Sequence, residues 1–309
     1  MGETGQGEIQ MIIQTDNLQK RFGRHDALKG VNFRVPEGSA YALIGPNGAG
    51  KTTAIKLLMN IIAPSEGTAT ILGVDSRALG PGQFARIGYV SENQKIPGYM
   101  KVAEYLAYLR PFYPSWDIAL EGEVLRQLRL PPDRKVANLS HGMRMKMALA
   151  CALPFRPKLL ILDEPFSGLD PLARDELIEG LLGQAGEMTI FISSQELSEI
   201  EAFVSDVGFL DDGKLLFQES IDALNARLRG VRVILDRAAI MPPGAPATWL
   251  DIQVAGNVLN FIDTQYDQGR LDARITALVA GVERVEIQPV PLRSMFKSLA
   301  RATRDGRAV

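Results

Sequence analysis

Several features that would point to other classes of protein are missing from this sequence. Cys151 is its single cysteine, so no disulfide can form within the chain, which fits a reducing compartment. No apolar run approaches the ~18 residues that a membrane-spanning helix needs. The polar, acidic start lacks the basic and apolar regions of a secretory signal, and Gln6 stands where myristoylation needs Ser or Thr. We therefore expect a cytoplasmic protein.

Excess positive charge is also missing. The formal net charge is -2, and the calculated pI is near 5.9. Domains that grip nucleic acid are usually strongly basic, so no nucleic-acid partner is expected. The length of 309 residues and the hydrophobic fraction of 46% suit one large domain with a sizeable core and a smaller second one.

The pattern of apolar and polar residues changes along the chain and divides it into regions. Residues 1–9 read as a disordered tail. From about 10 to 228, β-rich runs alternate with helical patterns, which predicts an α/β domain. The run 159–162 is apolar at every position and is typical of a parallel strand covered on both faces. The expected strands are 11–15, 31–35, 40–44, 69–72, 87–90, 159–163, 189–193, 207–210 and 215–218. The expected helices are 51–60, 102–113, 118–128, 143–153, 171–183 and 196–205.

Two further regions stand out. Residues 94–157 carry almost no strand signal, so we expect a helical subdomain inserted between two strands of the core. Residues 229–309 predict a small accessory α+β domain. Its expected strands are 231–235, 249–254 and 283–288, and its expected helices are 270–279 and 292–302.

A phosphate-binding loop is the strongest motif. A buried strand runs into Gly-Pro-Asn-Gly-Ala-Gly-Lys-Thr, and a helix leaves it, as in P-loop nucleotide-binding proteins. Glycines let backbone N–H groups point at phosphate oxygens, and the helix N-terminus favours negative charge. The alternative, a glycine-rich turn with an accidental lysine, fits these flanks poorly. The candidate ATP-binding residues here are Gly45, Pro46, Asn47, Gly48, Ala49, Gly50, Lys51, Thr52 and Thr53.

An acidic pair follows the apolar strand 159–162. Ligands of open α/β sheets bind beyond the carboxyl ends of the strands, where Asp163 and Glu164 stand. Asp163 and the Thr52 hydroxyl are candidate ligands of Mg²⁺. Glu164 is the candidate that polarises the attacking water, with Lys51 as its catalytic partner at the phosphates. Solvated acids at a strand end are the alternative.

With both motifs in place, residues 11–220 resemble the ATP-binding subunit of an ABC transporter. Leu139-Ser140-His141-Gly142-Met143 is similar to the family's signature loop. The resemblance implies that Ser140, His141 and Gly142 contact ATP held by a second ATPase subunit, although Ser140 also reads as an ordinary helix cap.

Two more segments fit the family. Residues 167–170 resemble its D-loop, and Asp170 equally reads as the cap of the helix that starts at Pro171. Phe22 matches the aromatic residue that stacks on adenine, although a core aromatic would read the same way.

Three segments depart from the family pattern, at four positions in all. Glu92 replaces a glutamine, and its carboxylate remains a candidate Mg²⁺ ligand. His141 and Met143 replace glycine and glutamine, as in subunits that resemble the ABC-2 export branch. Gln195 replaces a catalytic histidine; glutamine donates an N–H to phosphate but cannot carry charge or relay a proton. The hypothesis that follows is slowed hydrolysis with ATP binding and dimer closure intact.

The expected function is an ATP-binding and hydrolysing subunit that powers a separate ABC-2-type membrane permease, an exporter, from the cytoplasmic face. The aromatic-rich segment 99–116 is expected either to receive that permease or to form core. An ATP-gated regulatory or scaffold protein is the alternative, in which binding rather than turnover is the output. A soluble ATPase acting on ribosomes or DNA fits less well, because the chain has neither a second ATPase unit nor a long coiled-coil insertion.

Overall fold

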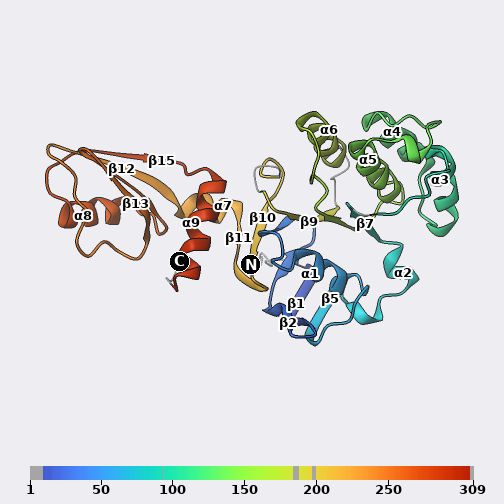
Figure 1. Ribbon diagram of the computed structural model, residues 1–309, viewed down its shortest axis with the longest axis horizontal. Helices are drawn as coiled ribbons and strands as arrows, with labels where there is room; N and C mark the ends of the chain where they lie inside the picture. Colours follow the sequence, from blue (N-terminus) through green and yellow to red (C-terminus); the bar gives the residue numbers. More distant parts are fainter. Residues whose placement is uncertain (1–9, 93, 184–187, 197–199, 307–309) are drawn as a thin grey trace, which may run out of the picture. The chain divides into compact units, whose positions relative to one another are not determined.

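The computed structural model describes residues 10–92, 94–183, 188–196 and 200–306, so the expected tail 1–9 lies outside it. The chain forms two compact units, Met1–Gln218 and Glu219–Val309 (Figure 1). Within the described ranges, no helix combines the length and the apolar character needed to cross a bilayer.

A six-stranded sheet in the order β11-β10-β4-β9-β8-β7 forms the frame of the first unit. Its strands are β4 (Ala40–Ile44), β7 (Ile87–Ser91), β8 (Leu159–Asp163), β9 (Thr189–Ser194), β10 (Asp206–Asp211) and β11 (Lys214–Ser220). The four pairs from β10 to β7 are parallel, and every residue of β8 and β9 is buried. The carboxyl ends of β4, β9, β8 and β7 therefore lie side by side along one edge.

A second, antiparallel sheet has the order β2-β1-β5-β6, with β3 also paired to β1. Its strands are β1 (Met11–Phe22), β2 (His25–Val31), β3 (Arg34–Pro36), β5 (Glu66–Ile71) and β6 (Val74–Asp75). Helix α1 (Lys51–Leu58) contacts β5 of this sheet and β8 of the parallel sheet, so it lies between the two. The rings of Phe33, Tyr41 and Phe191 stack in the core, with centroids 5.6 to 5.9 Å apart.

The helical subdomain lies between β7 and β8, as predicted. It contains α3 (Val102–Leu109), α4 (Ile118–Gln127) and α5 (His141–Ala152). The expected helix 102–113 is shorter than predicted, because a 3-10 turn, Arg110–Phe112, takes over around Pro111, which has no N–H to continue the α-helical ladder. Two other helices of the first unit are α2 (Pro81–Phe84) and α6 (Pro171–Leu182).

Two expectations for the first unit need correction. The strand expected at 31–35 is instead divided between β2, which ends at Val31, and β3, which begins at Arg34. Of the helix expected at 196–205, residues 197–199 lie outside the described ranges and residues 200–203 form turns. Glu196 N–H donates to the Ser194 hydroxyl at 3.1 Å, a local turn that competes with a helix start.

The second unit is an antiparallel sheet with helices, in the strand order β13-β14-β12-β15. Its elements are α7 (Ile221–Arg227), β12 (Arg229–Leu235), β13 (Trp249–Ala255), β14 (Val258–Asp263), α8 (Gln268–Leu278), β15 (Val282–Gln288) and α9 (Leu292–Arg304). Trp249 stacks on Phe261 in its core, with centroids 4.0 Å apart.

The boundary between the units falls at Gln218, earlier than the expected 228, because α7 is tied to the second unit. Arg227 donates to the Thr264 carbonyl at 3.0 Å, and its own carbonyl accepts from Tyr266 N–H at 2.9 Å.

Candidate functional site

The turn between β4 and α1 accepts only glycine at several positions. Gly48 and Gly50 have φ values of +81° and +110°, which residues with side chains rarely adopt. A Cβ atom at Gly45 would lie 2.0 Å from the Leu210 carbonyl oxygen, and one at Gly50 would lie 2.6 Å from the Ala27 carbonyl oxygen. The loop is therefore curled and closely packed, which is the form that a phosphate cradle needs.

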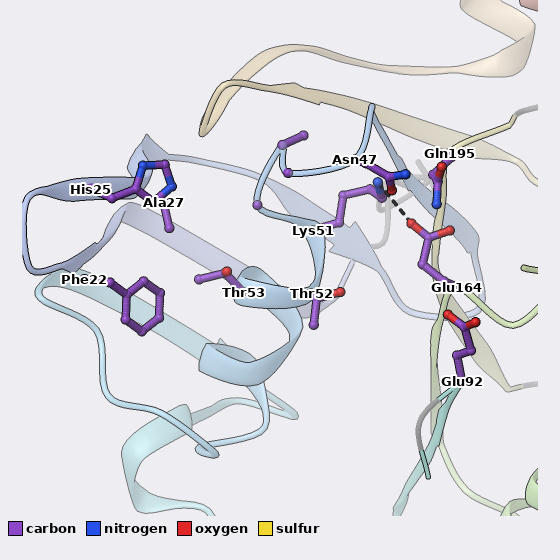
Figure 2. A pocket seen from close by; sticks show the side chains of 13 residues that line it. Phe22, His25, Ala27, Asn47, Lys51, Thr52, Thr53, Glu92, Glu164 and Gln195 are labelled. Atoms are coloured by element: carbon purple, nitrogen blue, oxygen red, sulfur yellow. Dashed lines mark ion pairs between the residues drawn. The ribbon is translucent and has the colours of Figure 1, made fainter.

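Lys51 places a buried cation under this loop. Its Nζ donates to the carbonyls of Gly45 at 2.6 Å and Pro46 at 3.1 Å. The same Nζ forms an ion pair with Glu164 Oε1 at 3.0 Å, shown dashed in Figure 2. The lysine and the candidate catalytic carboxylate, 113 positions apart in sequence (164 − 51), are thus brought into direct contact.

The two acids at the carboxyl end of β8 are held by hydroxyl groups. Asp163 Oδ1 accepts from Thr52 Oγ1 at 3.0 Å and from Ser193 Oγ at 2.8 Å. Glu164 has a φ of +51°, and its N–H donates to Ser193 Oγ at 3.0 Å. The Asp163 carbonyl accepts from Glu92 N–H at 3.3 Å. The ends of β7, β8 and β9 are thereby joined to the start of α1.

Tyr89 lies on β7, next to the strand that ends in Asp163. The pKa of Tyr89, on β7, is raised above its ordinary value mainly because partial burial penalises the phenolate. A hydrogen bond with Ser91 opposes that shift, and the charge of Asp163 adds to it.

These elements border a pocket of about 410 Å³, within the usual size of small-molecule sites. Figure 2 shows Phe22, His25 and Ala27 at one end, and Glu92, Glu164 and Gln195 at the other. The phosphate-loop residues lie between the two ends. They are Asn47, Gly48, Ala49, Gly50, Lys51, Thr52 and Thr53.

Some predicted site residues do not line this pocket. Gly45, Pro46 and Asp163 instead accept hydrogen bonds from Lys51 and Thr52, which do line it. The signature residues Ser140, His141 and Gly142 lie outside it and are considered next.

His25 and Ala27 line the pocket although sequence reasoning did not select them. Phe22 and His25 are direct partners at the end of the β1–β2 hairpin, across a turn in which Gly23 has a φ of +57°. Phe22 is 49% exposed, with Lys20 Nζ 5.0 Å from its ring centroid, so it is not a core aromatic. If β2 had been predicted as a strand, its hairpin with β1 would have placed His25 opposite Phe22.

The signature loop is tied to the D-loop segment of the same chain. Ser140 caps α5 by accepting from Met143 N–H at 3.3 Å, and Asp170 caps α6 by accepting from Ala173 N–H at 2.9 Å. His141 Nε2 lies 3.0 Å from the Ser167 carbonyl oxygen, a hydrogen bond in which the ring nitrogen donates. Ser140 and Asp170 therefore act as helix caps, and His141 joins the signature loop to the D-loop segment.

The residues around Asp163 suit a hard cation. Among the described residues, no three His, Cys, Asp or Glu side chains are grouped to hold a metal by themselves. Mg²⁺ usually needs only one or two carboxylates together with phosphate oxygens and water. The oxygen groups of Thr52, Asp163 and Glu92 near the phosphate loop fit that pattern, and the described residues that line the pocket include no sulfur ligand.

Comparison with known proteins decides what this arrangement is. A family model described as ABC transporter matches residues 28–167. The chain is 36% identical over 225 residues to the bacitracin transport ATP-binding protein BcrA of Bacillus licheniformis, covering 71% of this chain and 72% of the relative. This chain belongs to the ATP-binding proteins of ABC transporters.

Other relatives agree with that assignment. The lantibiotic transport ATP-binding protein SrtF of Streptococcus pyogenes is 35% identical over 217 residues, covering 68% of this chain and 92% of the relative. The solved structure of an ATP-binding subunit of an ABC transporter matches with a TM-score of 0.63 and 28% identity, over 70% of this chain and 92% of that one. The expected P-loop fold, ATP binding and ATPase class of this ABC protein are thus confirmed.

Proposed function

We propose that this ABC protein holds MgATP in the pocket of Figure 2 and powers a separate ABC-2-type export permease from the cytoplasmic face of the membrane. The observation that carries the proposal is the convergence of four strand ends on one pocket. Phe22 stacks on adenine, the phosphate loop and Lys51 hold the phosphates, and Thr52, Asp163 and Glu92 hold Mg²⁺, which neutralises phosphate charge when bound. The relatives that act in bacitracin and lantibiotic transport favour an export role.

Two copies of the chain complete each ATP site in this proposal. Ser140, His141 and Gly142 do not line the pocket that Lys51 borders, so the signature loop of one copy serves the ATP of the other. The start of α5 offers the Ser140 hydroxyl and backbone N–H groups to that phosphate. A heterodimer with a related ATPase subunit is the variant of this arrangement.

Hydrolysis is slowed at this site. Gln195 lines the pocket beside Glu164, where it can donate to a phosphate oxygen but cannot relay a proton. Glu164 remains as the carboxylate that polarises water, and Lys51 is its partner until phosphate arrives. Steady-state ATP hydrolysis by the wild-type chain and by Gln195→His tests this: faster turnover in the variant is expected.

The aromatic segment of the helical subdomain is proposed to receive the permease. Its inner rings are structural: Tyr113 stacks on Phe155 at 4.1 Å, and Trp116 Nε1 donates to Glu121 at 2.8 Å. Its outer rings, Tyr99, Tyr108 and Phe112, are exposed. Alanine at Tyr108 and Phe112 together should abolish co-purification with the permease and leave ATP binding unchanged.

An ATP-gated regulatory or scaffold protein is the second candidate, and Gln195 is the observation that favours it. ATP hydrolysis by the purified transporter complex separates the two functions. Turnover that rises with the transported substrate supports the exporter, and ATP-dependent association without turnover supports the scaffold.

The second unit is proposed to stabilise the dimer or to regulate its closure. A chain ending at Ser220, the last residue of β11, removes this unit without cutting the parallel sheet. Unchanged ATP-dependent dimerisation and turnover in that chain would contradict both roles.

A further inference from the structure

Ser193 contacts residues of the ATPase site, but it is not one of the reacting groups named above. The residue is 0% exposed and lies near the end of β9, where its Cα pairs with that of Asp163 on β8. Its hydroxyl proton is directed to Asp163 Oδ1 at 2.8 Å, and its oxygen accepts from Glu164 N–H at 3.0 Å. One small side chain thus contacts both acids at once.

The contact to Asp163 fixes the orientation of its carboxylate. Oδ1 accepts a second hydrogen bond from Thr52 Oγ1 at 3.0 Å. The two hydroxyls come from β9 and from α1 and both donate to Oδ1, so rotation about the Cβ–Cγ bond is restricted. A hydrogen-bonded partner of a metal-binding carboxylate orients that ligand even though it does not touch the metal.

The contact to Glu164 holds an unfavourable backbone conformation. The φ of +51° at Glu164 lies in the left-handed region, which a residue with a side chain enters only when its surroundings hold it there. The hydrogen bond from its N–H to Ser193 supplies such a restraint. This conformation directs the Glu164 side chain toward Lys51, with which it pairs at 3.0 Å.

The strand that carries Ser193 also leads to Gln195. The Ser194 hydroxyl accepts from Glu196 N–H at 3.1 Å, so the turn that presents Gln195 to the pocket is fixed just beyond Ser193. A shift of the end of β9 therefore reaches the two acids and Gln195 together.

We propose that Ser193 is a positioning residue for the ATPase reaction, which orients the Asp163 carboxylate for the cation and keeps the Glu164 backbone in its left-handed conformation. The proposal rests on the proposed function of the pocket. Ser193 forms and breaks no covalent bond, so its removal should weaken metal binding and turnover without weakening the grip on the nucleotide itself.

The test uses the full chain as Ser193→Ala, with Ser193→Thr as the conservative variant. The control is Thr189→Val, which removes a hydroxyl from the other end of the same buried strand, where it accepts from Gly38 N–H at 2.8 Å. For each variant, Mn²⁺ is titrated into the protein with ATP and followed by electron paramagnetic resonance. ATP affinity in EDTA, steady-state turnover and the unfolding temperature are measured alongside.

In Ser193→Ala, we expect the half-saturating Mn²⁺ concentration to rise and kcat to fall, each by about tenfold or more, as for other partners of metal ligands. ATP affinity in EDTA should change by less than about twofold, because no hydrogen bond to the phosphate loop is lost. Ser193→Thr should recover most of both losses, and Thr189→Val should show neither. If the alanine variant unfolds, Ser193→Cys, a weaker donor of similar size, should show intermediate losses.

Three results would overturn the inference. They are an unchanged Mn²⁺ titration and kcat in folded Ser193→Ala, an equal loss in Thr189→Val, and no recovery in Ser193→Thr. Failure of the wild-type chain to bind Mn²⁺ in an ATP-dependent way is a different outcome, because it would overturn the proposed function and this inference with it.

Discussion

In the proposed dimer the nucleotide pocket and the signature loop serve one ATP site together, yet this chain builds them differently. The pocket gathers residues from the ends of four parallel strands and from the β1–β2 hairpin. The signature loop instead starts α5, is capped by Ser140 and is bonded through His141 to the Ser167 carbonyl. One region is a concave binding site, and the other is a capped helix start that lies outside it. This difference is what the proposed dimer requires, in which a single chain provides one half of each of two sites.

The largest effect is expected at the pocket. Lys51→Ala should weaken ATP binding by about 100-fold, because a hydrogen bond to a charged group is worth about 1.5–3 kcal/mol. Isothermal titration calorimetry with ATP measures the change. Lys56→Ala, an exposed lysine of the same helix, is the control and should bind as the wild type does. Equal affinities of Lys51→Ala and the wild type for ATP would contradict this difference between the two regions, because the pocket would then not be the phosphate site.

At the signature loop, we expect a substitution to lower turnover and to leave ATP binding nearly unchanged. Ser140→Asp keeps a good helix cap but places a negative charge where the partner's phosphate approaches. Turnover should fall by about 100-fold while the affinity of the monomer for ATP stays within about twofold. Ser220→Asp, the same change at the cap of α7, is the control and should leave turnover unchanged. Weakened ATP binding by the Ser140→Asp monomer would show that the two regions are not separate.

The substitution Gln195→His tests whether Gln195 limits hydrolysis in the pocket. General acid–base catalysis contributes about 10²–10⁴-fold, so we expect turnover to rise at least about tenfold in this variant. The KM for ATP should change little, because both side chains donate an N–H. Phosphate release under saturating MgATP measures the effect, and Gln195→Ala controls for loss of the glutamine itself. Turnover that is unchanged or lower in Gln195→His would mean that Gln195 does not limit hydrolysis.

The smallest effect is expected at His141. His141→Ala removes the hydrogen bond to the Ser167 carbonyl, which should lower the free energy of unfolding by about 1 kcal/mol. Turnover should fall by no more than about fivefold, because Ser140 and the α5 N-terminus remain. Chemical denaturation and phosphate release measure the two quantities. A loss of turnover as large as that of Ser140→Asp would assign His141 a direct role at the partner's phosphate.

The parallel sheet and the phosphate loop were predictable because each requires particular residue types at consecutive positions in the sequence. Buried parallel strands need continuous apolar runs, such as 159–162, and the loop needs glycine where backbone approaches closely, as at Gly45 and Gly50. The inserted helical subdomain was likewise marked by helical periodicity without strand signals.

The features that were missed depend on neighbours that sequence spacing does not reveal. β2 carries polar residues between its apolar ones, and its pairing with β1 supplies what its own propensity lacks. His25 reaches the pocket only through its pairing with Phe22. Ser193 lies two residues before Gln195, but only the register between β8 and β9 brings its hydroxyl to Asp163.

Mixing two inactive variants tests the shared ATP site most directly. Lys51→Ala has an intact signature loop, Ser140→Asp has an intact pocket, and neither homodimer contains an intact site. In an equimolar mixture, half of the dimers should pair the two variants and hold one intact site each. Turnover should therefore recover to about a quarter of the wild-type value. A mixture no more active than either variant alone, beside an active wild type, would contradict the account.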